Sequence, residues 1–143
     1  MKLSGVMDMT VLRKITAQEV TPGRSPIVRP DEPFQNVVEQ LEQHGPVDFV
    51  VTDEAGTYLG TLTSNAIQMA LLEREAVPLL VVGEVMRPDI PTVRPDEPLD
   101  SVFDKFAQHE VVILAIVRPE DNKVVGTITQ TAVIGAYMQA LAE

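Results

Sequence analysis

The sequence predicts an α+β fold built from two copies of one structural unit. Residues 28–33 read VRPDEP, and residues 93–98 repeat these six letters without a change. The apolar pattern after the hexapeptide also repeats, and Gly-Thr-Leu-Thr at 60–63 returns as Gly-Thr-Ile-Thr at 126–129. A duplication of about sixty-five residues therefore predicts two tandem repeats, each strand–helix–strand–strand–helix, packed with pseudo-two-fold symmetry.

The composition limits the classes of function open to the chain. Its 143 residues carry a formal net charge of −10, which argues against nucleic acid as a partner because phosphate backbones are bound by basic surfaces. A hydrophobic content of 45% suffices for a core, and an aromatic content of 4% predicts an aliphatic interior. The absence of cysteine excludes disulfides, thiolate metal sites and a cysteine nucleophile, and is typical of a reducing compartment.

No segment of the sequence has the pattern of a signal peptide or a membrane span. Residues Met1–Thr10 lack the continuous apolar stretch of a secretory signal, and the longest apolar run, Val111–Val117, is too short to cross a bilayer. We therefore predict a cytoplasmic segment that does not insert into a membrane. Attachment to a membrane protein through residues outside this sequence stays open.

The duplication divides the chain into four parts. Residues 1–10 are weakly patterned and are either a lead-in or an expression remnant. Residues 11–76 form the first repeat, which opens with a short helix over Val11–Val20, and residues 77–81 form a linker. Residues 82–143 form the second repeat.

Both repeats begin in the same way. The proline after each arginine of the hexapeptide favours extended backbone before it, which predicts short strands at Ile27–Val28 and Thr92–Val93. Asp31 and Asp96 stand where helix N-caps belong, each with a proline two residues on. The helices that follow have apolar residues at i, i+3, i+4 and i+7. These residues are Phe34, Val37, Val38 and Leu41 in the first repeat, and Leu99, Val102, Phe103 and Phe106 in the second.

Two strands and a second helix complete each repeat. Continuous apolar runs predict strands covered on both faces. Turn-forming residues at Asp53–Gly56 and Pro119–Asn122 follow these apolar strands and predict a second, returning strand in each repeat. A threonine links each returning strand to the second helix. The expected strands are Phe49–Val51, Tyr58–Thr63, Val111–Val117 and Lys123–Thr129, and the expected helices are Ser64–Glu75 and Gln130–Ala142.

The order of these elements, the Gly-Thr-Leu/Ile-Thr sequence at the strand-to-helix turn and the stretch Glu84–Asp96 resemble the CBS domain, named after cystathionine beta-synthase. Two tandem copies are similar to the usual CBS pair, over residues 11–142. The resemblance implies a regulatory module that needs no cofactor and binds an adenine nucleotide, such as AMP, ADP or ATP, in the cleft between the repeats. It also implies that two pairs associate.

The resemblance further implies where such a ligand would be held. In the family the turn reads Gly, two mostly apolar residues, Ser or Thr, two variable residues and Asp; the hydroxyl contacts phosphate or ribose, and the Asp holds the ribose. Thr63 and Thr129 occupy the hydroxyl positions. The other contacts carried over by position, mostly backbone near the first and second strands, are Ser25, Pro26, Val50, Ile90, Pro91 and Ile116.

Both repeats depart from the family pattern at the aspartate, which is replaced by Ala66 and Ala132. A hydrogen bond to a charged group contributes about 1.5–3 kcal/mol, so we expect binding that is about tenfold to hundredfold weaker. Two interpretations of Thr63 and Thr129 stay open: they contact a ligand, or they only cap the helices. For the strand residues, the alternative to ligand contact is core packing.

His44 and His109 recur at the same place in both repeats, near the C-terminal end of a helix, where the helix dipole favours a protonated imidazole. No carboxylate pair, nucleophile with a base or metal-ligand cluster accompanies them in the sequence. We therefore predict no catalytic residue and no metal site, and a protein that is not an enzyme.

A second function stays open beside ligand sensing. Residues Ala132–Leu141 are similar to the terminal helix of CBS pairs appended to bacterial chloride-channel-type transporters. Together with the two alanines, this favours a ligand-free dimerisation scaffold, for instance the cytosolic tail of a chloride channel or transporter. For either function, the apolar second helices predict a homodimer.

Overall fold

The computed structural model describes residues 8–20, 25–45 and 47–142, which form two compact units. The first-repeat unit contains residues 25–90, without residue 46, and residues 120–124; the second-repeat unit contains residues 8–20, 91–119 and 125–142. The segment that precedes each repeat's first strand thus packs in the unit of the other repeat. The boundaries of the units follow the packing of the chain, whereas the predicted boundaries of the repeats follow the duplication in the sequence. The two sets of boundaries therefore differ.

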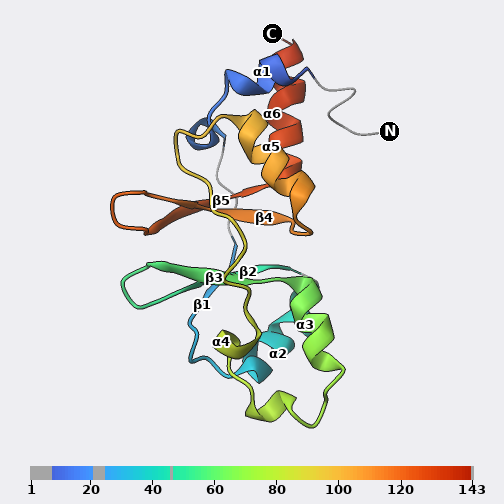
Figure 1. Ribbon diagram of the computed structural model, residues 1–143. Coiled ribbons are helices and arrows are strands. Elements are labelled where there is room, and N and C mark those ends of the chain that lie inside the picture. The colour runs from blue at the N-terminus through green and yellow to red at the C-terminus, as the bar shows by residue number, and fades with distance from the viewer. Residues whose placement is uncertain (1–7, 21–24, 46, 143) are drawn as a thin grey trace. The chain divides into compact units, whose positions relative to one another are not determined.

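The first-repeat unit is a three-stranded sheet with its helices on one side (Figure 1). The strand order is β1-β2-β3; β1 is parallel to β2, and β3 is antiparallel to β2. The elements of this unit are β1 (Ile27–Val28), α2 (Phe34–His44), β2 (Phe49–Thr52), β3 (Tyr58–Leu62), α3 (Ser64–Leu71), the 3-10 helix η3 (Val77–Leu79) and α4 (Val82–Val85).

The second-repeat unit is built around two hydrogen-bonded strands, β4 and β5, again with helices on one side (Figure 1). The predicted strand Thr92–Val93 is reduced to a single parallel bridge between Val93 and Ile116. The elements of this unit are α1 (Met9–Arg13), the 3-10 helix η2 (Ala17–Glu19), α5 (Leu99–Gln108), β4 (Ile113–Val117), β5 (Val124–Thr129) and α6 (Gln130–Ala142).

The prediction of one helix over Val11–Val20 is wrong. The structure has two short helical pieces, α1 and η2, separated by residues 14–16. Thr16 forms an isolated antiparallel bridge with Pro98, and the carbonyl of Ile15 accepts a hydrogen bond of 2.8 Å from the N–H of Leu99. These bonds hold the backbone extended where a helix would have to continue. Residues 21–24, which directly follow the predicted helix, lie outside the described residues.

Asp31 and Asp96 lie in turns and are not helix N-caps. The helices begin after the next proline, at Phe34 and Leu99. The N–H of Phe34 donates to the carbonyl of Leu80 at 2.9 Å, and that of Leu99 donates to a carbonyl of the α1–η2 segment. Main-chain carbonyls far away in the sequence therefore satisfy the donors that an aspartate cap would have served.

The end of α3 also differs from the prediction, because the helix stops at Leu71 and does not reach Glu75. The N–H groups of Leu72 and Glu73 bond to carbonyls three residues back, which tightens the last turn. The hairpin turn at Asp53–Gly56 is confirmed. The Asp53 carboxylate accepts two backbone hydrogen bonds of 2.9 Å, and the one from Thr57 contributes most to lowering the pKa of Asp53.

The predicted aliphatic interior is confirmed in both units. The core of the first-repeat unit consists of Val28, Phe34, Val37, Phe49, Val51, Leu62, Ile67, Val77 and Val82. In the second-repeat unit α1 packs against α5 and α6. The buried apolar residues there include Leu12, Leu99, Val102, Phe103, Phe106, Leu114, Ile128, Val133 and Tyr137.

Candidate functional site

In the first-repeat unit, four predicted site residues lie at one end of the sheet strands. The parallel strands β1 and β2 begin at this end, and β3 ends there, since its last residue lies opposite the first residue of β2. Ser25 and Pro26 precede β1, Val50 lies near the start of β2, and Thr63 follows β3. The carbonyl of Pro26 accepts a hydrogen bond of 3.1 Å from the N–H of Val50.

Thr63 is a buried helix cap. Its Oγ1 accepts a hydrogen bond of 3.0 Å from the N–H of Ala66, and its carbonyl accepts one of 3.0 Å from Ile67. The N–H of Ser64 donates to the Asp48 carboxylate at 2.8 Å, and Asp48 is only 1% exposed. Several of the donors at the start of α3 are therefore already bonded within the protein.

Asp48 was not predicted as part of the site. It stands one residue before the buried strand β2, and its neighbours Val47 and Phe49 are apolar. A single acidic residue inside an apolar run is the signal that could have pointed to a buried carboxylate, since burial of such a group requires hydrogen-bond partners.

Thr129 caps α6 in the same way as Thr63 caps α3. Its Oγ1 accepts a hydrogen bond of 3.0 Å from the N–H of Ala132. The first N–H of the helix, that of Gln130, donates to the main-chain carbonyl of Val112 at 3.3 Å. A neutral carbonyl therefore takes the place that a carboxylate holds in the first repeat.

Both threonines cap a helix, and most of the predicted strand residues are buried in the core, while ligand contact at these positions stays a prediction. The side chains of Val50, Ile90 and Ile116 are at most 4% exposed. A ligand at these positions would meet backbone groups and not side chains. Ile90 belongs to the first-repeat unit, and Pro91 belongs to the second-repeat unit.

Tyr58 connects β3 to the end of the first-repeat unit, a link that the sequence did not predict. Its hydroxyl lies 2.8 Å from Oγ1 of Thr61 and 3.3 Å from the carbonyl of Ile90. A phenol has one proton, so it donates to the carbonyl and accepts from the threonine. Burial raises the pKa of Tyr58, and the bond from Thr61 lowers it by less.

The described residues hold no group of three His, Cys, Asp or Glu side chains placed to bind a metal ion. His44 ends α2, and His109 directly follows α5, as their helix-terminal positions in the sequence predicted. Within the described part of the chain, no helix combines the length and the hydropathy that a membrane span requires.

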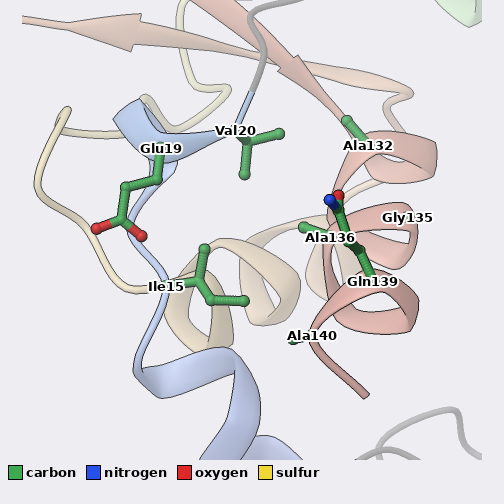
Figure 2. A pocket seen from close by; sticks show the side chains of 8 residues that line it. All are labelled: Ile15, Glu19, Val20, Ala132, Gly135, Ala136, Gln139 and Ala140. Carbon is green, nitrogen blue, oxygen red and sulfur yellow. The ribbon is translucent and has the colours of Figure 1, made fainter. Parts of the chain in front are cut away.

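A pocket of about 530 Å³ lies along α6 within the second-repeat unit (Figure 2). Its first contact on α6 is Ala132, the position where the family has its aspartate. The single charged side chain of the lining is Glu19, whose Oε2 accepts the N–H of Thr16 at 3.3 Å. The lining residues are Ile15, Glu19, Val20, Ala132, Gly135, Ala136, Gln139 and Ala140.

The sequence matches the CBS domain family twice, at residues 17–73 and 82–139. The chain belongs to the CBS domain family. The resemblance seen in the duplicated turn is thereby confirmed, and so is the α+β fold of two tandem CBS repeats. No curated protein matches the sequence significantly.

Solved structures of CBS pairs have the same fold. The CBS domain pair of protein MJ0100, in complex with 5′-methylthioadenosine and S-adenosyl-L-methionine, is 20% identical with a TM-score of 0.72, and the match covers 87% of this chain and 97% of that one. CBSX2 in complex with AMP is 21% identical with a TM-score of 0.71, covering 87% and 96%.

The third structure is the cytosolic domain of the Mg²⁺ channel MgtE in complex with ATP, at 22% identity and a TM-score of 0.70. The match covers 89% of this chain and 50% of that one. Identities this low establish the common fold and leave ligand and partner to be argued from the residues of this chain.

Proposed function

We propose that the chain is a non-catalytic regulatory module that senses an adenine-containing ligand, with AMP, ADP and ATP as the first candidates. The observation that carries the proposal is the duplicated turn, in which a strand ends at Thr63 or Thr129 and a capped helix begins. The complexes of similar fold contain AMP, ATP, 5′-methylthioadenosine or S-adenosyl-L-methionine, and all four are adenine compounds.

The residues nearest a ligand would be the predicted ones at each sheet edge. In the first-repeat unit these are Thr63 with the backbone of Ser25, Pro26, Val50 and Ile90. In the second-repeat unit they are Thr129 with the backbone of Pro91 and Ile116. Binding would favour one arrangement of a partner domain over another. A non-catalytic module transmits a signal by shifting such a conformational equilibrium.

Calorimetric titration with AMP, ADP, ATP, NAD and S-adenosylmethionine tests this proposal. We expect a saturable heat for at least one compound, with a dissociation constant weakened by the missing aspartates. Flat heats up to millimolar concentrations of all five compounds would overturn it.

A ligand-free scaffold is the second candidate, and Ala66 and Ala132 favour it because neither offers a hydrogen bond to ribose. In this function the chain would serve as a cytosolic dimerisation segment, for example of a chloride channel or transporter. A membrane-spanning segment encoded upstream of Met1 would favour this second function over ligand sensing.

Both candidate functions include a homodimer in the cytoplasm. Large apolar side chains with 37% to 75% exposure gather on the second helices of the repeats. They are Met69 and, directly after α3, Leu72 in the first repeat, and Ile134, Met138 and Leu141 on α6. Exposed apolar patches of this kind are typical of interaction surfaces. Light scattering should therefore give twice the mass of one chain, and a monomer at working concentrations would contradict the dimer.

A further inference from the structure

We infer that the homodimer assembles head to tail, with α3 of one copy packed against α6 of the second copy. A closed dimer contains this contact twice. In a head-to-head dimer, each of these helices would instead meet its own copy. The inference rests on the homodimer of the proposed function and goes beyond it by naming the partner surface of each helix. Charge and side-chain size support it independently.

The outer face of α6 is the surface that a second copy would cover. The helix contains no charged residue over Gln130–Ala142, yet its buried residues are only Val133 and Tyr137. Met138 is 62% exposed, and Leu141 is 54% exposed. An uncharged helix with apolar residues on its outer side is typical of an interface, because such a face is normally buried.

The two units differ in charge. Among the described residues, the first-repeat unit has thirteen acidic and four basic side chains, an excess of nine negative charges. The second-repeat unit has seven acidic and five basic side chains, an excess of two. A head-to-head dimer would bring two strongly acidic units together, and like charges facing each other across an interface are unfavourable. The head-to-tail contact avoids this repulsion.

The charges next to the two helices favour the same pairing. Glu73 and Glu75 directly follow α3 and are exposed. In the second-repeat unit, α1 packs against α6 and ends at two exposed basic residues, Arg13 and Lys14. Arg13 also pairs with Asp100 at 3.3 Å. The acidic end of α3 therefore fits the surface around α6 better than it fits another α3.

The sizes of two equivalent side chains are also complementary. Met69 and Gly135 correspond at the spacing of 66 that relates Thr63 to Thr129. Met69 is 60% exposed, whereas Gly135 lines the pocket along α6 (Figure 2), and a Cβ placed on it would have no atom within 4 Å.

Head-to-tail packing relates α3 and α6 of two copies by an approximate two-fold axis, near which a residue meets its equivalent. Methionine then faces glycine, and a large side chain opposite a small one packs without a void. In a head-to-head dimer methionine would face methionine, and glycine would face glycine across a gap.

Cysteine cross-linking of the full chain tests the inference, because the wild-type sequence contains no cysteine. Leu72→Cys and Met138→Cys place thiols at equivalent, exposed positions of the two repeats. With a short bismaleimide, we expect neither variant alone to cross-link. In an equal mixture that has exchanged subunits, about half of the dimers should cross-link, which is the statistical share of mixed dimers.

Glu54→Cys, exposed in the hairpin turn of the first-repeat unit, measures cross-linking by random collision and should give none with either variant. Cross-linking of Leu72→Cys or Met138→Cys to itself, or no cross-link in the mixture, would overturn the inference and leave the homodimer intact. A wild-type monomer in light scattering would overturn both, while ligand binding could still be observed by calorimetry.

A compensating pair of substitutions tests the contact between Met69 and Gly135. Gly135→Met should weaken the dimer about tenfold or more through overpacking, and circular dichroism establishes that the variant is folded. Adding Met69→Ala to the same chain should restore the dissociation constant to within about threefold of the wild type, because the two residues meet across the interface. Sedimentation equilibrium measures both constants. A loss that Met69→Ala does not repair would contradict the head-to-tail contact.

Discussion

Glu97 and Glu32 hold the same place in the duplicated hexapeptide but have different surroundings. Glu97 is 2% exposed, lies 2.8 Å from Nζ of Lys105 and accepts a 2.8 Å hydrogen bond from Oγ of Ser101. In the first repeat Gln40 stands where Lys105 stands. Among the described residues, Oε2 of Glu32 is buried without a hydrogen-bond partner. The two glutamates therefore differ both in their hydrogen-bond partners and in exposure, since Glu32 is only partly buried.

Replacing these glutamates by glutamine should have unequal effects on stability. Glu97→Gln removes the charge that Lys105 pairs with, so we expect the free energy of unfolding to fall by about 1.5–3 kcal/mol. Glu32→Gln removes a charge with a poorly satisfied oxygen, so we expect no loss or a small gain. Urea unfolding near neutral pH measures both, and equal losses would contradict the account.

The contribution of Glu97 should also depend on pH. Burial raises the pKa of Glu97, but hydrogen bonds from Lys105, Ser101 and the Arg94 backbone outweigh it and leave the pKa below the ordinary 4.5. A lowered pKa in the folded state stabilises the protein fully above the unfolded value and loses this effect as the pH falls through the folded value. The stability difference between wild type and Glu97→Gln should therefore shrink below about pH 4.5. A difference that stays constant on acidification would count against the ion pair.

Ala132→Asp restores the family's aspartate at the mouth of the α6 pocket. We expect AMP to bind about tenfold to hundredfold more tightly, because a hydrogen bond from ribose to a charged group contributes about 1.5–3 kcal/mol. Thr131→Asp is the control, since a shift of one residue turns the side chain to another face of the helix. The same gain from both variants would show that charge alone, and not its position, improves binding.

At the scale of elements, a close approach of main chains fixes β3 against the segment after α4. The N–H of Arg87 donates to the carbonyl of Thr61 at 2.8 Å, and the return bond is 3.0 Å. Gly60 lies beside this pair, and a Cβ on it would stand 3.0 Å from the carbonyl oxygen of Arg87. Backbone cannot move aside as a flexible side chain can.

Gly60→Ala should therefore destabilise the protein by about 1–3 kcal/mol through overpacking. Gly135→Ala is the matched control, because its Cβ meets no atom within 4 Å and alanine favours a helix over glycine by about 1 kcal/mol. Thermal unfolding should show a loss for the first variant and a gain for the second. A stable Gly60→Ala would mean that the two segments can separate without cost.

The sequence predicted most elements, because each repeat carries its own periodicity and its copy fixes the register. It failed where a distant segment decides the local structure. The extended bridge of Thr16 with Pro98 and the bonds that start α2 and α5 come from residues far away in the sequence. No local pattern contains this information, so the local sequence predicts N-caps at Asp31 and Asp96 that the structure does not have.

At the scale of the whole molecule, the duplication predicted the family and the two related turns, including both alanines in place of aspartate. It did not predict how the turns differ. Asp48, the carbonyl of Val112 and the pocket along α6 depend on which segments pack beside each helix. The segment that precedes the first strand of each repeat packs in the unit of the other repeat. This arrangement is likewise a property of the folded chain and not of either repeat alone.

The central claim is that this CBS pair senses an adenine compound, and ligand-dependent thermal stability tests it most directly. A compound that binds only the folded chain raises the free energy of unfolding with its concentration, by about 2.7 kcal/mol at one hundred times its dissociation constant. We predict a concentration-dependent rise of the melting temperature with AMP, ATP or S-adenosylmethionine, and none with GMP. An unchanged melting temperature with every adenine compound at millimolar concentration, or an equal rise with GMP, would contradict the claim.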